Sequence, residues 1–232
     1  MVLAREYYPP DFIDANLIKL RQARKKGLDS YLHNAGLSLD DLVGKDVLDV
    51  GAGAFAYFGD GIRQLEESGL KLNCKVVSVD AGKFSNPKDI AQGANKKLGE
   101  TEFENLKLKK KFDYIFSNFS TPYSFYNTNQ SGAGEWLDAE DGKNLDKKIG
   151  AILKSAMAHL KSGGKAVFYP IYEGEVDFGK GGKRNFGDLK NIIAKELDRF
   201  NKKVSYSFEP VQSVTPGLPP AERLVIIPTG RL

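Results

Sequence analysis

Two acids and two glycines early in the chain have the types and spacing to bind a ligand. The segment reads Asp49-Val-Gly51-Ala-Gly53, and Asp80 ends the next apolar run, Val-Val-Ser-Val. Glycine at positions 51 and 53 allows a tight turn and a close approach of backbone to ligand. Asp49 can accept hydrogen bonds from cationic or backbone groups, and Asp80 can accept them from ribose hydroxyls. A Gly-x-Gly turn formed only for its own geometry is the alternative, and the two acids favour a site for a ribose-containing ligand.

Alternating strand-like and helical runs must position these residues. The expected strands are Asp46 to Val50, Lys75 to Asp80, Phe112 to Ser117, Lys165 to Ile171, Val204 to Phe208 and Arg223 to Ile227. The expected helices are Asp11 to Asn34, Gly59 to Leu70, Asn86 to Lys97, Asn144 to Leu160, which stops at Ser162-Gly-Gly164, and Asp188 to Phe200. This alternation predicts βαβ units and a parallel sheet. The two acids and the glycines then share the carboxyl edge of the sheet, where ligands bind in such folds.

The length of 232 residues suits one domain with elaborations. We expect residues 1–232 to form a single domain with an N-terminal helical extension, 1–42, and inserted loops at 118–143 and 172–187. Both loops follow strands, so they should lie at the same edge as the acids and glycines. Tyr7 to Pro10 would then close the site.

The composition excludes several classes of protein. Hydrophobic residues make up 41% and charged residues 28%, which is ordinary for a globular protein and unlike collagenous or disordered chains. One cysteine and two histidines supply neither an internal disulfide nor a zinc-ligand cluster, so we expect a reducing compartment and no metal. No apolar run is long enough to span a bilayer and the start lacks a signal pattern, which predicts a cytoplasmic protein without membrane contact. The net charge of +4 permits an anionic partner without requiring one.

Four motifs in order give the chain a family resemblance. They are Asp49-Val-Gly-Ala-Gly53, Asp80 after its apolar run, Phe112-Asp-Tyr-Ile-Phe-Ser-Asn118, and Leu160-Lys-Ser-Gly-Gly-Lys-Ala-Val-Phe168. From about Val43 to Phe168 the chain resembles the class I S-adenosylmethionine-dependent methyltransferases. The resemblance implies an α/β fold, the doubly wound, three-layer α/β/α Rossmann-like methyltransferase fold, with a seven-stranded, mostly parallel sheet and an antiparallel last strand.

The resemblance also implies methyltransferase activity with S-adenosylmethionine as cofactor. Its residues would be Asp49, Gly51, Ala52 and Gly53 at the methionine moiety, Asp80 and Ala81 at the ribose, Glu102 and the Phe103 backbone at the adenine, and Ser117 and Asn118 beside the methyl group. Some of these residues have a purely structural alternative. Asp49 or Asp80 could cap a helix or turn, Glu102 could be a solvated surface acid, and Asn118 could cap the loop that it opens. The chain departs from the family at Phe55, where a third glycine is frequent.

The acceptor and the catalytic residue are not identified by these motifs. A small-molecule acceptor is expected, and Tyr123 and Asn118 are considered as proton acceptors. The basic segments Arg21 to Lys26, Lys107 to Lys111 and Lys180 to Arg184 permit a nucleic acid partner without indicating one. The alternatives are an RNA or protein methyltransferase, a non-catalytic methyltransferase-like binding module, which Phe55 motivates, and an NAD(P)-dependent oxidoreductase. Ala56 at the last glycine position weighs against the oxidoreductase. The oligomeric state is not predicted.

Overall fold

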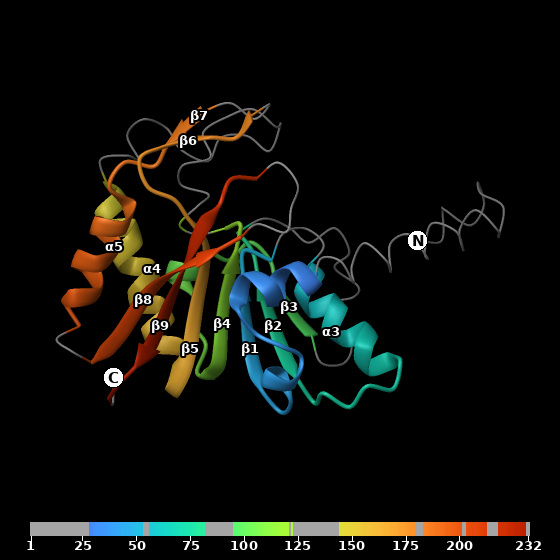
Figure 1. The fold of residues 1–232 in the computed structure, drawn as a ribbon. Helices are drawn as coiled ribbons and strands as arrows, with labels where there is room; N and C mark the ends of the chain where they lie inside the picture. The colour runs from blue at the N-terminus through green and yellow to red at the C-terminus, as the bar shows by residue number, and fades with distance from the viewer. Residues whose placement is uncertain are drawn as a thin grey trace.

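The computed structural model describes residues 28–52, 56–81, 95–120, 122, 144–179, 183–200, 203–212 and 218–230. A seven-stranded sheet with the order β3-β2-β1-β4-β5-β9-β8 forms its centre (Figure 1). The strands are β1 (Asp46–Val50), β2 (Lys75–Val79), β3 (Asn95–Leu98), β4 (Phe112–Asn118), β5 (Leu160–Ile171), β8 (Val204–Val211) and β9 (Ala221–Pro228). The crossover from β3 back to β4, on the far side of β1, makes the sheet doubly wound.

Strand direction agrees with the expected fold. β1 pairs in parallel with both β2 and β4, β2 with β3, and β4 with β5. The last strand, β9, runs antiparallel to both neighbours, β5 and β8. The prediction of a doubly wound, Rossmann-like sheet with an antiparallel last strand is confirmed.

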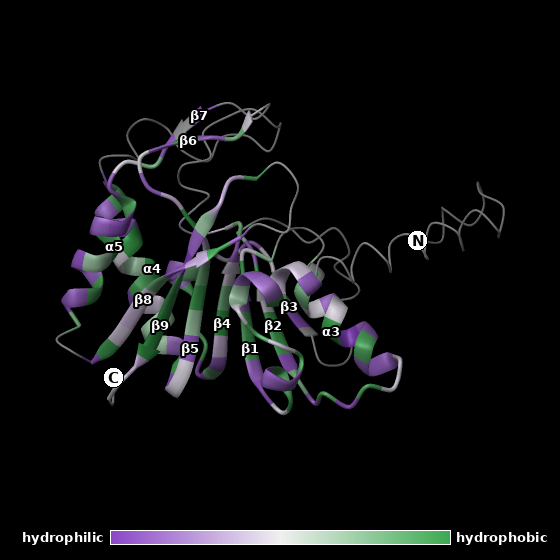
Figure 2. Cartoon of the chain, viewed as in Figure 1, coloured by the Kyte–Doolittle hydropathy of each residue, from purple (hydrophilic) through white to green (hydrophobic). Residues whose placement is uncertain are grey.

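Helices cover both faces of the sheet (Figure 1). A helix described over residues 28–35 and α3 (Tyr57–Glu67) cover one face, and α4 (Leu145–His159) and α5 (Leu189–Asp198) cover the other. Short 3-10 helices precede β1 (η1, Asp40–Leu42) and β4 (η3, Phe103–Asn105). A hydrophobic core lies on each face of the sheet, and alternate residues of one strand point into opposite cores. Val47 packs on the α3 side and Leu48 on the α4 side. Figure 2 shows the corresponding apolar strands between helices whose outer sides are hydrophilic.

The helix expected from Asn86 to Lys97 is wrong at its end. Asn95–Leu98 forms β3 and pairs in parallel with Val76–Val79 of β2; residues 86–94 lie outside the described residues. Lysine and leucine are good helix formers, but helix propensity is a weak preference, and strand pairing, which satisfies the backbone groups along the otherwise open edge of β2, overrides it here. Tertiary pairing therefore decided the secondary structure here.

Two further boundaries differ from the prediction. β5 begins at Leu160, directly after α4, rather than at Lys165, so Ser162 to Gly164 lies within the strand. A Cβ at Gly164 would lie 2.9 Å from the Asp113 carbonyl oxygen, so the bare glycine lets the two backbones meet at an irregularity of the β4–β5 pair. The segment expected as a loop at 172–187 contains a hairpin of β6 (Glu175–Asp177) and β7 (Lys183–Asn185), which stands above the carboxyl ends of the strands (Figure 1).

Some expectations fall outside what is described. Tyr7 to Pro10 and most of the 118–143 insertion lie there, as do Gly53, Phe55 and Tyr123. Within the described helices, none is long and apolar enough to cross a bilayer.

Candidate functional site

Three neighbouring strands end together and bring the predicted residues to one edge. Val50 of β1 is in register with Val79 of β2 and with Ser117 of β4. The next residues along the chain, Gly51, Asp80 and Asn118, therefore emerge side by side from the carboxyl edge of the sheet. Doubly wound folds bind ligands outside this edge, at the point where the strand order reverses.

Asp49 lies beneath this edge and is fully buried. The Ser78 hydroxyl lies 3.5 Å from Oδ2 of Asp49, whereas Oδ1 has no hydrogen-bond donor in the part of the chain that the structure describes. Burial raises the pKa of Asp49 to about 8; the Ser78 hydrogen bond lowers it, and Asp80 and Asp60 raise it further. A buried oxygen without a donor is costly, at about 1–3 kcal/mol. The carboxyl group therefore fits a cationic donor, which would restore both the missing hydrogen bond and the charged form.

Gly51 forms the turn that leaves β1. Its φ is +66°, a left-handed conformation suited to glycine, and the amides of Gly51 and Ala52 both donate to the Val79 carbonyl oxygen at 2.8 and 3.1 Å. A Cβ on Gly51 would lie 1.7 Å from the Ser120 hydroxyl oxygen, so the missing side chain makes room for Ser120. The close approach predicted for a ligand at Gly51 is thus made here by a side chain of the loop after β4.

The turn after β4 explains how Ser120 reaches Gly51. Ser117 is buried, and Asn118 at the strand end is partly exposed. Phe119 has a φ of +53°, and its amide donates to the Tyr169 carbonyl oxygen at 2.7 Å. The Phe119 ring meets the Tyr169 ring edge to face at 5.3 Å. These contacts fix the chain as it turns from β4 back over β1.

The helix over residues 28–35 contributes two site residues that sequence reasoning did not name. The Asn34 amide donates to Oδ1 of Asn118 at 2.8 Å, while the buried Oδ1 of Asn34 has no donor within the described ranges. Burial raises the pKa of Tyr31 well above its usual value, Asp49 raises it further, and a hydrogen bond from Asn118 lowers it. Tyr31 is therefore a neutral phenol at physiological pH. The sequence did contain a signal for these two residues: Tyr31 and Asn34 are hydrogen-bonding side chains three residues apart on the otherwise apolar side of a helix.

Residues predicted for the ribose and adenine lie next to one another. The Thr101 amide donates to the Asp80 carbonyl oxygen at 2.9 Å, which places Glu102 close to the end of β2. The Glu102 side chain is exposed and accepts a hydrogen bond from Asn105 at 2.6 Å. Phe103 is buried in the core, and its carbonyl oxygen accepts from Ser155 at 2.7 Å.

Ala81 follows Asp80 and is exposed. The described part of the predicted site is thus brought together at one edge by β1, β2 and β4, with the Phe103 side chain turned into the core. Asp49 and Ser117 lie beneath that edge, and the helix over residues 28–35 closes one side of it.

Solved structures share the fold, whereas the sequence comparisons found no match. No protein-family model and no curated protein matches the sequence. A candidate S-adenosylmethionine-dependent methyltransferase from Methanococcus maripaludis aligns over 94% of this chain and 93% of its own, with a TM-score of 0.54 and 12% identity. DesVI from Streptomyces venezuelae aligns over 96% of this chain and 100% of its own, with a TM-score of 0.52 and 13% identity.

A third similar structure is the complex between the Haloferax volcanii Trm112 methyltransferase activator and a candidate methyltransferase. The matched chain aligns over 90% of this one and 95% of its own, with a TM-score of 0.50 and 13% identity. Together with the strand order and the antiparallel β9, these likenesses define the class: the protein has the fold of the class I S-adenosylmethionine-dependent methyltransferases.

Proposed function

We propose that this protein is an S-adenosylmethionine-dependent methyltransferase that acts on a small-molecule acceptor. The observation that carries the proposal is Asp49, a fully buried carboxyl group directly beneath the glycine turn, one oxygen of which has no donor among the described residues. Such a group fits the α-ammonium of the cofactor's methionine moiety, because ion pairing offsets the cost of burying the charge. Residues 1–232 would act as one domain, with the segments at 1–42, 118–143 and 172–187 around the acceptor.

The residues of the chain would bind the cofactor and align the acceptor, and they would not need to activate the methyl group. The cofactor supplies a methyl group that is already activated by its sulfonium, so the protein's task is to orient the acceptor and exclude water. Asp49 would hold the ammonium, with the turn at Gly51, Ala52 and Gly53 around the methionine moiety.

The remaining cofactor contacts follow the same edge. Asp80 and Ala81 would lie at the ribose, and Glu102 with the Phe103 backbone at the adenine. Ser117 and Asn118 would face the methyl group, with Asn118 held by Asn34 at 2.8 Å.

A second candidate function is a methyltransferase-like binding module that does not use the cofactor. The position of Ser120 favours it, because this side chain occupies the space that Gly51 leaves free. Under the first proposal, Ser120 must move or must itself contact the cofactor. Affinity for the cofactor product separates the two candidates.

The test is isothermal titration calorimetry with S-adenosylhomocysteine, beside NADH, on the full chain. We expect micromolar affinity for S-adenosylhomocysteine alone and at least tenfold weaker binding by Asp80→Asn. The matched control is Asp40→Asn, which neutralises an exposed carboxylate next to η1 and should bind as the unmodified protein does. Binding of neither ligand would overturn the proposal in favour of the binding module. Binding of NADH alone would favour an oxidoreductase.

A further inference from the structure

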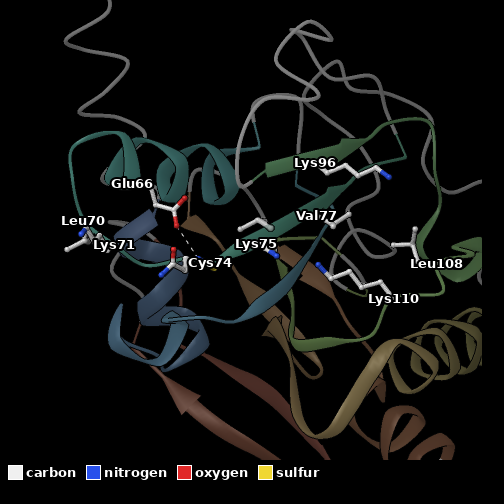
Figure 3. A pocket seen from close by; sticks show the side chains of 11 residues that line it. Glu66, Leu70, Lys71, Cys74, Lys75, Val77, Lys96, Leu108 and Lys110 are labelled. Carbon is white, nitrogen blue, oxygen red and sulfur yellow. Dashed lines mark hydrogen bonds between the residues drawn. The ribbon is translucent and has the colours of Figure 1, made fainter.

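A second cavity lies at the opposite end of the sheet from the glycine turn. Its volume is about 660 Å³, and it is bounded by the end of α3, the first residues of β2 and β3, and the segment that leads into β4 (Figure 3). This volume is in the range of small-molecule sites, about 300–1,000 Å³. Lys75 lines the cavity and precedes Asp80 by five strand residues, about 16 Å at 3.3 Å per residue. The cavity is therefore separate from the proposed cofactor site.

Four lysines line this cavity: Lys71, Lys75, Lys96 and Lys110. The Lys110 ammonium pairs with Asp46 at 2.6 Å, whereas the other three form no ion pair with any carboxylate in the described part of the chain. The one acidic residue in the lining, Glu66, accepts a hydrogen bond from the Cys74 amide at 3.1 Å. The lining thus carries a net charge of about +3, and a concave surface with low-dielectric walls concentrates the field of such charges.

Apolar side chains form the rest of the wall. Val77 is 7% exposed, and Leu108 packs against the same core from the segment before β4. Figure 3 shows these two side chains between Lys96 and Lys110. The Asn73 side chain adds a neutral polar group at the rim. The cavity therefore combines cations with a nonpolar surface. Free inorganic phosphate would contact the cations but has no nonpolar part to pack against that surface.

We propose that this cavity binds a phosphorylated small molecule of the nucleoside diphosphate class. Lysine ammonium groups are compact point charges that bind phosphate oxygens, and several lysines suit more than one negative charge. The nucleoside would lie against Val77 and Leu108, within hydrogen-bonding reach of the polar rim. The lining contains no aromatic side chain, so the base would pack against aliphatic side chains rather than stack on a ring.

The test uses UDP and GDP as probes, with uridine and pyrophosphate as the two halves of the ligand. Each is titrated calorimetrically into the full chain at about 0.1 M salt with saturating S-adenosylhomocysteine, so that nucleoside binding at the other edge is blocked. We expect at least one diphosphate to bind tenfold or more tightly than either half. Lys96→Glu should weaken that binding at least tenfold. Lys154→Glu, which makes the same charge change on an exposed residue of α4, should leave it unchanged.

Amide chemical shifts locate the bound probe. Changes centred on Val77, Lys96 and Leu108 support the site, and changes centred on Asp80 overturn it. The proposal is also wrong if neither diphosphate binds, if pyrophosphate alone binds as tightly, or if both lysine variants weaken binding equally. Thermal melting of each variant confirms that it is folded. The outcome does not depend on the proposed methyltransferase activity, because the amide chemical shifts locate the probe even if S-adenosylhomocysteine does not bind.

Discussion

Replacing Asp49 with asparagine should stabilise the protein at neutral and alkaline pH and weaken cofactor binding at least tenfold. The carboxyl group is fully buried with one unsatisfied oxygen, and its pKa is raised from 3.8 to about 8. Between these two pH values the folded protein holds a proton that the unfolded chain has lost. Stability therefore falls as pH rises through this window, because the unfolded state binds fewer protons. Asparagine imitates the neutral carboxyl in shape and does not titrate.

The size of the effect follows from the shift in pKa. About four pKa units at 1.36 kcal/mol each amount to about 6 kcal/mol above pH 8 and about 4 kcal/mol at pH 7. Between pH 5 and pH 8 the unfolding free energy of the unmodified protein should fall by about 4 kcal/mol relative to Asp49→Asn. The asparagine amide can change the unfolding free energy by an amount that does not depend on pH. This change does not affect the difference between the two proteins in how the unfolding free energy varies with pH.

Urea denaturation at several pH values between 5 and 8 measures this slope, with Asp40→Asn as the exposed control. Equal pH dependence of Asp49→Asn and the unmodified protein would refute the assignment of the buried proton to Asp49. Calorimetry with S-adenosylhomocysteine on the same samples supplies the second readout. We expect the variant to bind at least tenfold more weakly, because it cannot form the ion pair, and unchanged affinity would refute the role of Asp49 in holding the ammonium.

Three further predictions concern other parts of the chain. Gly51→Ala should destabilise the protein by on the order of 1–3 kcal/mol more than Gly44→Ala in urea denaturation, because both have positive φ but only Gly51 faces Ser120; equal losses would contradict this. Lys161→Met should cost about 1 kcal/mol at pH 7, because the lysine bridges two carboxylates that are 23% and 24% exposed. Ion pairing with the lysine holds the pKa of both carboxyl groups below 3.8, so that loss should shrink in melts as pH falls through this lowered range, and a loss independent of pH would show that packing is responsible. Burial raises the pKa of Cys74 to about 12, so a thiol reagent should label it only at the rate of unfolding, and fast labelling at pH 8 would count against this.

The strands next to the site could be predicted because their residues alone carry the signal. Asp46–Val50 and Lys75–Val79 are short, β-branched and flanked by glycine or acid, and the structure has them within one residue of the expected limits. β3 could not be predicted in the same way. Its residues, Asn-Lys-Lys-Leu, carry no strand preference and become a strand only because β2 offers an open edge.

The candidate site also contains residues that the local sequence predicts and residues that only the tertiary structure brings there. Asp49, Gly51 and Asp80 follow directly from motif and spacing, since each sits at a fixed offset from a strand end. Asn34 and Ser120 are distant from them in sequence and have no motif. The first reaches the site through the packing of its helix, and the second through the turn at Phe119.

The sequence by itself determined the strands β1 and β2 and the chemistry at their ends, because strand patterning and glycine turns are local properties. Only the tertiary structure decided which side chains surround those ends, and it alone revealed the raised pKa of Asp49, since desolvation depends on every neighbour that excludes water. The lysine-lined cavity likewise joins Lys71, Lys75, Lys96 and Lys110. These residues belong to separate segments, and only the folding of the sheet brings their charges together.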